Sequence, residues 1–174
     1  RDQVLREIMR RMDSNGRPIA IIGHSRGGLM GWALASQLQE RVSHLVLLGA
    51  PVAAFRESVT SGNSLASAGA VGRMLMRMSD ELRDMLDPGC KYPSCGCALV
   101  DDIMSPLSSS TLLLSIRGSD DLVVGKAAQD SSDGETLQAK ASHLGLVYNP
   151  RVYHALGRFL AGRSLSTALP VQRN

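Results

Sequence analysis

Short apolar runs alternate along the chain with stretches in which apolar residues recur every three or four positions. Four runs predict strands, at residues 19–22, 45–48, 111–116 and, more weakly, 136–141. Outside residues 52–110, three stretches have helical spacing, at residues 4–12, 29–38 and 149–161. Uninterrupted apolar runs are typical of strands buried on both faces of a parallel sheet, as we expect for 19–22. The alternation of strands with helices therefore predicts an α/β fold with a mostly parallel sheet and flanking helices.

Two helix ends are marked by the residues around them. Asn15-Gly16 ends the first helix with a pair that tolerates left-handed backbone, and Pro18 prevents the helix from resuming. Asn149-Pro150 starts the last helix, with Asn as N-cap and Pro at the first helical position. Residues 162–174 have no apolar period, and we expect a loose C-terminal tail there.

Residues 52–110 interrupt the alternation. A stretch rich in Ser, Gly and Ala is followed by a helical pattern from Val71 to Leu86 and then by Cys90, Cys95 and Cys97. A segment of about 59 residues forms only a marginal core alone, so we expect an insertion in a single core of residues 1–161. The cysteine spacings do not match a structural zinc site. We expect a local disulfide in an oxidising compartment and free thiols elsewhere.

Composition narrows the class of protein. The chain has 174 residues, of which 44% are hydrophobic and 3% aromatic, with a net charge of +3. These values fit one globular domain, and the scarcity of aromatic residues argues against stacking on nucleic-acid bases. The basic residues are scattered, which also disfavours a nucleic-acid partner. No apolar run approaches the ~20 residues that cross a bilayer.

The first residues bear on location and completeness. Residues 1–13 are charged and amphipathic rather than basic and then apolar, so no signal peptide is visible and a cytoplasmic protein is favoured. The chain nevertheless opens on Arg and enters a helical pattern at once, as a piece of a longer protein would.

The strongest chemical signal is the sequence Gly23-His24-Ser25-Arg26-Gly27, between a predicted strand and a predicted helix. This Gly-x-Ser-x-Gly pattern is typical of a nucleophile elbow, a sharp turn that exposes the serine hydroxyl above the sheet. We expect side chains at Gly23 and Gly27 to collide with neighbouring elements. The following helix would point its first amides toward the reacting centre, where they favour negative charge.

A serine nucleophile needs a base that an acid orients. His143 follows the last predicted strand and therefore lies at the carboxyl edge of the sheet, which makes it the best base. We expect His24 to point elsewhere, His44 to precede its strand at the opposite end, and His154 to lie within the last helix.

The acid is expected at the end of the strand at 111–116. Asp120 and Asp121 both follow that strand, and turn geometry alone does not separate them, since aspartate is also common in plain turns.

With these residues in place, the chain resembles the α/β-hydrolase family, and in particular its lipases and esterases, over residues 1–161. The matching segments are GHSRGG at 23–28, LLGAP at 47–51, GSDDLVV at 118–124 and SHLGL at 142–146. The order Ser, Asp, His is the order of that family. The family's acid loop, counted from Gly118, selects Asp121 over Asp120. The resemblance also implies a cap over the substrate pocket at 52–110.

The resemblance implies hydrolysis of small-molecule carboxylic esters or lipid-like esters through an acyl-enzyme on Ser25, with the Arg26 amide as an oxyanion donor and without a cofactor or metal. Acyl transfer on the same triad is the nearest alternative. A catalytically inert fragment or interaction module is a second one, because no HGGG-like segment supplies another oxyanion donor.

The family's sheet has further strands before the elbow strand, and the resemblance implies that they are missing here. We therefore expect a weakly active part of a longer hydrolase, with an exposed sheet edge through which it could self-associate.

Overall fold

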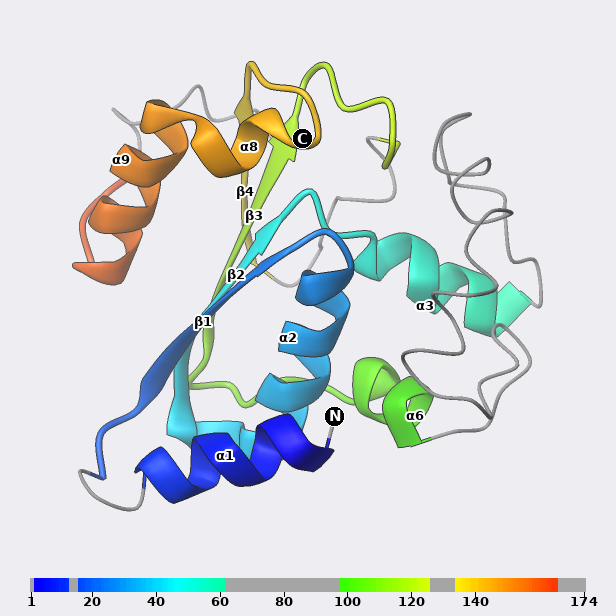
Figure 1. Cartoon of the computed structure of the whole chain (residues 1–174), viewed down its shortest axis with the longest axis vertical. Coiled ribbons are helices and arrows are strands. Elements are labelled where there is room, and N and C mark those ends of the chain that lie inside the picture. The colour runs from blue at the N-terminus through cyan, green and yellow to red at the C-terminus, as the bar shows by residue number, and fades with distance from the viewer. Residues whose placement is uncertain (1, 13–15, 62–97, 126–133, 166–174) are drawn as a thin grey trace.

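The computed structural model describes residues 2–12, 16–61, 98–125 and 134–165, and its centre is a four-stranded parallel sheet (Figure 1). Its strands are β1 (Ile19–His24), β2 (Val42–Leu48), β3 (Leu112–Gly118) and β4 (Glu135–Ala139), in the order β1-β2-β3-β4. All three strand pairs are parallel. The predicted α/β fold is confirmed, and the architecture fits the C-terminal part of an α/β-hydrolase sheet.

Helices cover both faces of the sheet. In chain order they are α1 (Asp2–Met12), α2 (Arg26–Leu38), the 3₁₀ turn η1 (Gln39–Arg41), α3 (Val52–Ser61), α6 (Ala98–Met104), α8 (Gly145–Tyr148) and α9 (Pro150–Leu160). Figure 1 shows α8 and α9 on one side of the sheet and α1, α2 and α6 on the other. None of the helices in the described residues is both long and apolar enough to cross a bilayer.

The side chains of residues 45–48 in β2 show why this run is apolar without interruption. Val46 and Leu48 belong to the core cluster that includes Phe159 of α9, whereas Leu45 and Leu47 belong to the cluster that includes Trp32 of α2. Successive side chains of a strand point to opposite faces. Because helices cover both faces of this part of β2, all four positions from 45 to 48 are buried and select apolar side chains, whereas Ser43 and His44 near the start of the strand are only partly buried.

β1 differs from this pattern and corrects one prediction. Its side chains alternate between partly buried and exposed, and Ile22 is 48% exposed. The cluster beneath α9 takes its strand residues from β2, β3 and β4. The α9 side of β1 is therefore open, and the expectation that residues 19–22 are buried on both faces is wrong for these described residues.

Other predictions are tested by local structure. The N-cap of α9 is confirmed, since the Asn149 side chain accepts a hydrogen bond from the Arg151 amide at 2.9 Å. His44 lies within β2 and not before it. The tail is not loose from its start, because Leu165 is only 3% exposed and packs in the α9 cluster. The helical pattern at 71–86 and the three cysteines lie outside the described residues.

The register brings three loops to one edge of the sheet. His24 at the end of β1 is aligned with Leu48, and Leu48 is aligned with Ile116 near the end of β3. Gly118 at the end of β3 is aligned with Ala139, the last residue of β4. The turns that follow β1, β3 and β4 therefore leave the sheet at the same carboxyl edge, where ligands bind in open α/β sheets.

Candidate active site

The turn between β1 and α2 holds Ser25 in a backbone conformation that is rare for a side-chain-bearing residue. Its φ is 54° and its ψ is −125°. Such strain costs roughly 1–3 kcal/mol and persists only where the surroundings enforce it. The Ser25 amide donates to the Leu48 carbonyl at 2.9 Å, and the Gly28 amide donates to the Ser25 carbonyl at 3.0 Å. The sharp turn expected of the Gly-x-Ser-x-Gly sequence is therefore present.

Close backbone packing explains one of the two predicted glycines. A Cβ at Gly23 would lie 2.5 Å from the Gly27 carbonyl oxygen and 2.6 Å from the Gly28 Cα, both backbone atoms that cannot move aside. A Cβ at Gly27 would meet nothing within 4 Å, so the expected collision at Gly27 is wrong. The crowded position is Gly28, where a Cβ would lie 2.3 Å from the Cβ of Ala50. Gly27 is exposed on the first turn of α2, whereas Gly28 faces the chain leaving β2.

The acid loop after β3 separates the two aspartates. The Asp121 side chain is fully buried, and its Oδ1 accepts hydrogen bonds from the amides of Val123 and Val124 at 2.9 Å each. Its Oδ2 lies 2.8 Å from Nδ1 of His143. Asp120 is exposed, and its backbone amide donates to the Ala141 carbonyl at 3.1 Å. Asp121, and not Asp120, thus faces the histidine.

His143 connects Asp121 to Ser25. Its Nε2 lies 2.9 Å from the Ser25 hydroxyl oxygen, and its side chain is 10% exposed. An ionised carboxylate can only accept hydrogen bonds, so its contact with Nδ1 assigns the imidazole proton to that nitrogen. Nε2 is then left as an acceptor for the serine hydroxyl proton, which is the arrangement that general-base catalysis requires.

Gly49 leaves the space for this pair of side chains, a role that the sequence alone does not predict. Its φ is +55°, and a Cβ there would lie 3.2 Å from the Asp121 Oδ2 and 3.3 Å from the His143 Nδ1. The side chain of any other residue would press on the hydrogen bond between acid and base. The signal in the sequence was a glycine directly after the buried strand β2, at the edge where the site was expected.

His24 does not point elsewhere, contrary to expectation. Its Nε2 lies 2.9 Å from the carbonyl oxygen of His143, and the centroids of the two rings are 4.7 Å apart. Adjacency to Ser25 does not keep this side chain out of the site, because the loop of His143, 119 residues further along the chain, comes up against it. The other two histidines lie apart from it: His44 packs edge-on against Phe159, and His154 is exposed on α9.

Arg26 is the first residue of α2, and its side chain is exposed. The amides in the first turn of a helix have no carbonyl partner within the helix and carry its partial positive charge. The Arg26 amide belongs to this first turn of α2, which attracts an anion, and it directly follows Ser25 in the chain. Within the described residues, no group of three His, Cys, Asp or Glu side chains could hold a metal ion.

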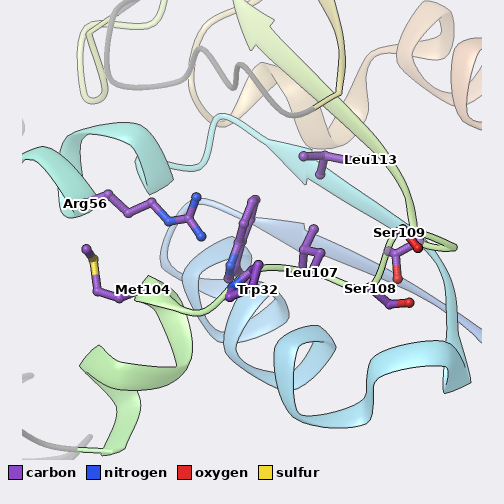
Figure 2. A pocket seen from close by; sticks show the side chains of 9 residues that line it. Trp32, Arg56, Met104, Leu107, Ser108, Ser109 and Leu113 are labelled. Carbon is purple, nitrogen blue, oxygen red and sulfur yellow. The ribbon is translucent and has the colours of Figure 1, made fainter.

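A cavity lies elsewhere in the described part of the chain, and none of the triad residues lines it (Figure 2). Its volume is about 420 Å³, and its lining comes from α2, α3, α6, β3 and the segment before β3: Trp32, Arg56, Met104, Pro106, Leu107, Ser108, Ser109, Thr111 and Leu113. The Arg56 guanidinium stacks 4.1 Å from the centroid of the Trp32 ring and donates to the carbonyls of Ile103 and Ser105. Since Leu113 is at the beginning of β3, this cavity lies toward the opposite end of the sheet.

Comparisons with known proteins agree with the fold. A family model described as the alpha/beta hydrolase fold matches residues 3–87. The chain therefore has the α/β-hydrolase fold. No curated protein sequence matches it.

Several solved structures are similar to the chain. Human thioesterase 2 has 19% identity and a TM-score of 0.51, with 92% of this chain and 80% of that chain covered. A monoacylglycerol lipase of Paleococcus ferrophilus has 14% identity and a TM-score of 0.55, with 94% and 76% covered. An epoxide hydrolase of Bacillus megaterium has 16% identity and a TM-score of 0.58, with 92% and 75% covered. At these identities the likeness shows a shared hydrolase fold and leaves the reaction to be argued from the site.

Proposed function

We propose that the protein is a serine hydrolase that cleaves carboxylic esters through an acyl-enzyme on Ser25. The observation that carries this proposal is the unbroken chain of hydrogen bonds from Asp121 through His143 to Ser25, with distances of 2.8 and 2.9 Å. These three side chains come from three different loops at one sheet edge. A buried acid, an imidazole and a hydroxyl at these separations are the parts that acyl transfer to serine needs.

Each residue has one role in the proposed reaction. His143 Nε2 takes the Ser25 proton as the hydroxyl oxygen attacks the ester carbonyl, and the imidazolium then returns that proton to the leaving alcohol. Asp121 holds the ring in the required tautomer and stabilises its positive charge. Water, activated by the same imidazole, hydrolyses the acyl-serine ester and releases the carboxylic acid.

The Arg26 amide is the proposed donor to the negatively charged oxygen of the tetrahedral intermediate. Its place at the start of α2, directly after the strained Ser25, supports this role. A donor aimed at the developing oxyanion contributes about 3–4 kcal/mol to the stability of the transition state.

The surroundings of the triad favour an apolar substrate. Leu122 directly follows the acid and is 71% exposed, and Leu144 directly follows the base and is 67% exposed. These two side chains are therefore the candidates for contact with an apolar group of the substrate. We therefore propose an ester with an apolar acyl or alcohol group as the substrate class.

A serine-directed fluorophosphonate probe tests the nucleophile. Labelling should occur in the wild type and in Ser110→Ala, an exposed serine before β3 that serves as the matched control, and should be lost in Ser25→Ala. Turnover of p-nitrophenyl esters of increasing chain length should disappear with the labelling. Full labelling of Ser25→Ala would contradict the proposal, and so would an unlabelled, inactive but folded wild type.

A further inference from the structure

His24 lies on the face of β1 that looks toward the loop of His143. Side chains alternate along a strand, so Ile22 and His24 share a face. The register partner of His24 is Leu48, whose side chain belongs to the cluster beneath α9. The His143 loop connects β4 to α8, and α8 lies on that same side of the sheet (Figure 1). The two histidine rings therefore come together at this edge of the sheet.

The contact between them has a defined direction. A backbone carbonyl only accepts hydrogen bonds, so the His24 Nε2 donates to the His143 oxygen across 2.9 Å. The two rings are 4.7 Å apart and inclined by 43°. His24 therefore carries a proton on Nε2 and also flanks the imidazole of His143.

This bond ties the base to the strand that carries the nucleophile. The loops of Asp121 and His143 are already joined to each other, since the amides of Ser119 and Asp120 donate to the carbonyls of Ala139 and Ala141. Ser25 belongs to a separate element, β1 and its turn. Because His24 precedes Ser25 directly, its bond to the His143 carbonyl links the segment of the nucleophile to the loop of the base.

We propose that His24 is a positioning residue that holds the His143 base against Ser25. The proposal deepens the proposed function and rests on it for its kinetic consequence. His24 does not touch the substrate or exchange a proton with it. It reduces the freedom of the His143 backbone, so that the ring is in place before the ester binds.

Two substitutions separate hydrogen bonding from bulk. His24→Phe keeps a ring of similar size and loses the donor, whereas His24→Gln keeps an N–H near the position of Nε2 and loses the ring. We expect His24→Phe to lower kcat on a p-nitrophenyl ester by roughly tenfold with KM unchanged, as expected for one neutral hydrogen bond that matters in the transition state. His24→Gln should restore most of the loss. His154→Phe, the same change at an exposed site of α9, should match the wild type.

A second measurement does not depend on activity. The proton that His143 Nδ1 shares with Asp121 should give a downfield proton NMR resonance that Asp121→Asn removes. In His24→Phe this resonance should broaden and exchange faster with solvent, and in His24→Gln it should remain as in the wild type. Melting temperatures of all variants show whether they are folded.

The outcomes distinguish the two proposals. Lack of Ser25 labelling in a folded wild type overturns the proposed function, and the resonance still decides whether His24 holds the base. Equal kcat in His24→Phe and the wild type, or equal losses in the Phe and Gln variants, overturns the positioning role while the triad stands. A normal resonance in His24→Phe overturns it as well.

Discussion

β1 and β3 each end in a turn that delivers one residue of the candidate triad, yet the two strands lie in different surroundings. β3 is central and buried at six of its seven positions, with Leu114 and Ile116 fully enclosed. β1 is the edge strand of the described sheet, and its Ile22 is half exposed. Both read as short apolar runs in the sequence. An apolar run therefore identifies a strand, but the neighbours of that strand decide how much of it is buried.

The two turns are also stabilised by different means. The Ser25 turn depends on missing side chains, since backbone atoms approach Gly23 too closely for any Cβ. The Asp121 turn depends on a side chain that is present, because Oδ1 of Asp121 accepts two backbone amides of its own loop. Steric exclusion thus shapes the nucleophile turn and hydrogen bonding shapes the acid turn. Substitutions should affect the two turns in different ways.

The largest effect is expected at the acid. Asp121→Asn should lower kcat by about 10⁴-fold, since an amide at this position favours the wrong imidazole tautomer. Asp120→Asn, one residue away and exposed, should stay within about twofold of the wild type. Ester turnover of both variants measures the difference. Similar small losses would mean that both are turn residues and that the acid lies elsewhere.

The burial of the two strands can be compared by truncating one side chain in each. Leu114→Ala in β3 should lower the free energy of unfolding by about 2–5 kcal/mol, because it leaves a cavity in a closed core. Ile22→Ala in β1 should cost about 1 kcal/mol or less, because that side chain is half in water. Urea unfolding of both variants provides the test. Equal losses would show that the face of β1 carrying Ile22 is covered in solution.

The steric account of the nucleophile turn is tested by two glycines in the same motif. Gly23→Ala should destabilise the fold by roughly 1–3 kcal/mol, because the added methyl collides with backbone. Gly27→Ala has open space at a helical position and should stabilise the fold by up to about 1 kcal/mol. Thermal unfolding compares them, and destabilisation of the same size in both would refute the packing described for the turn.

The smallest effect concerns α1, which lies on the other face of the sheet from α9. Hydrogen bonds from Arg10, which has the larger effect, and from Arg11 lower the pKa of Glu7 from 4.5 to about 2. Because the pKa is lowered on folding, the stabilisation is present above about pH 4.5 and is lost as the pH falls toward 2. The groups are exposed, so the effect on melting temperature should be slight and should weaken with salt. An NMR titration of the Glu7 carboxyl should give a value near 2, and Arg10→Gln should raise it toward 4.5.

The sequence predicted more of the fold than of the surroundings of the site. The four strands and the helices at 2–12, 26–38 and 150–160 follow from apolar period and from local signals such as Asn149-Pro150, because these patterns reflect contacts within one element. The positions of Ser25 and His143 directly after predicted strands identify them as site candidates, whereas Asp120 and Asp121 follow the same strand and are not separated by position. The family resemblance selected Asp121, which is the aspartate that lies against His143.

The tertiary structure decided what depends on pairs of distant segments. Neither the contact of His24 with the His143 carbonyl nor the space that Gly49 leaves for the acid and base can be read from neighbouring residues, since each spans loops far apart in the chain. The same holds for the crowding at Gly28 and the open space at Gly27, because the crowding depends on where Ala50 lies. Periodicity records which side of an element faces a core, and only the assembled sheet determines which atoms meet across its edge.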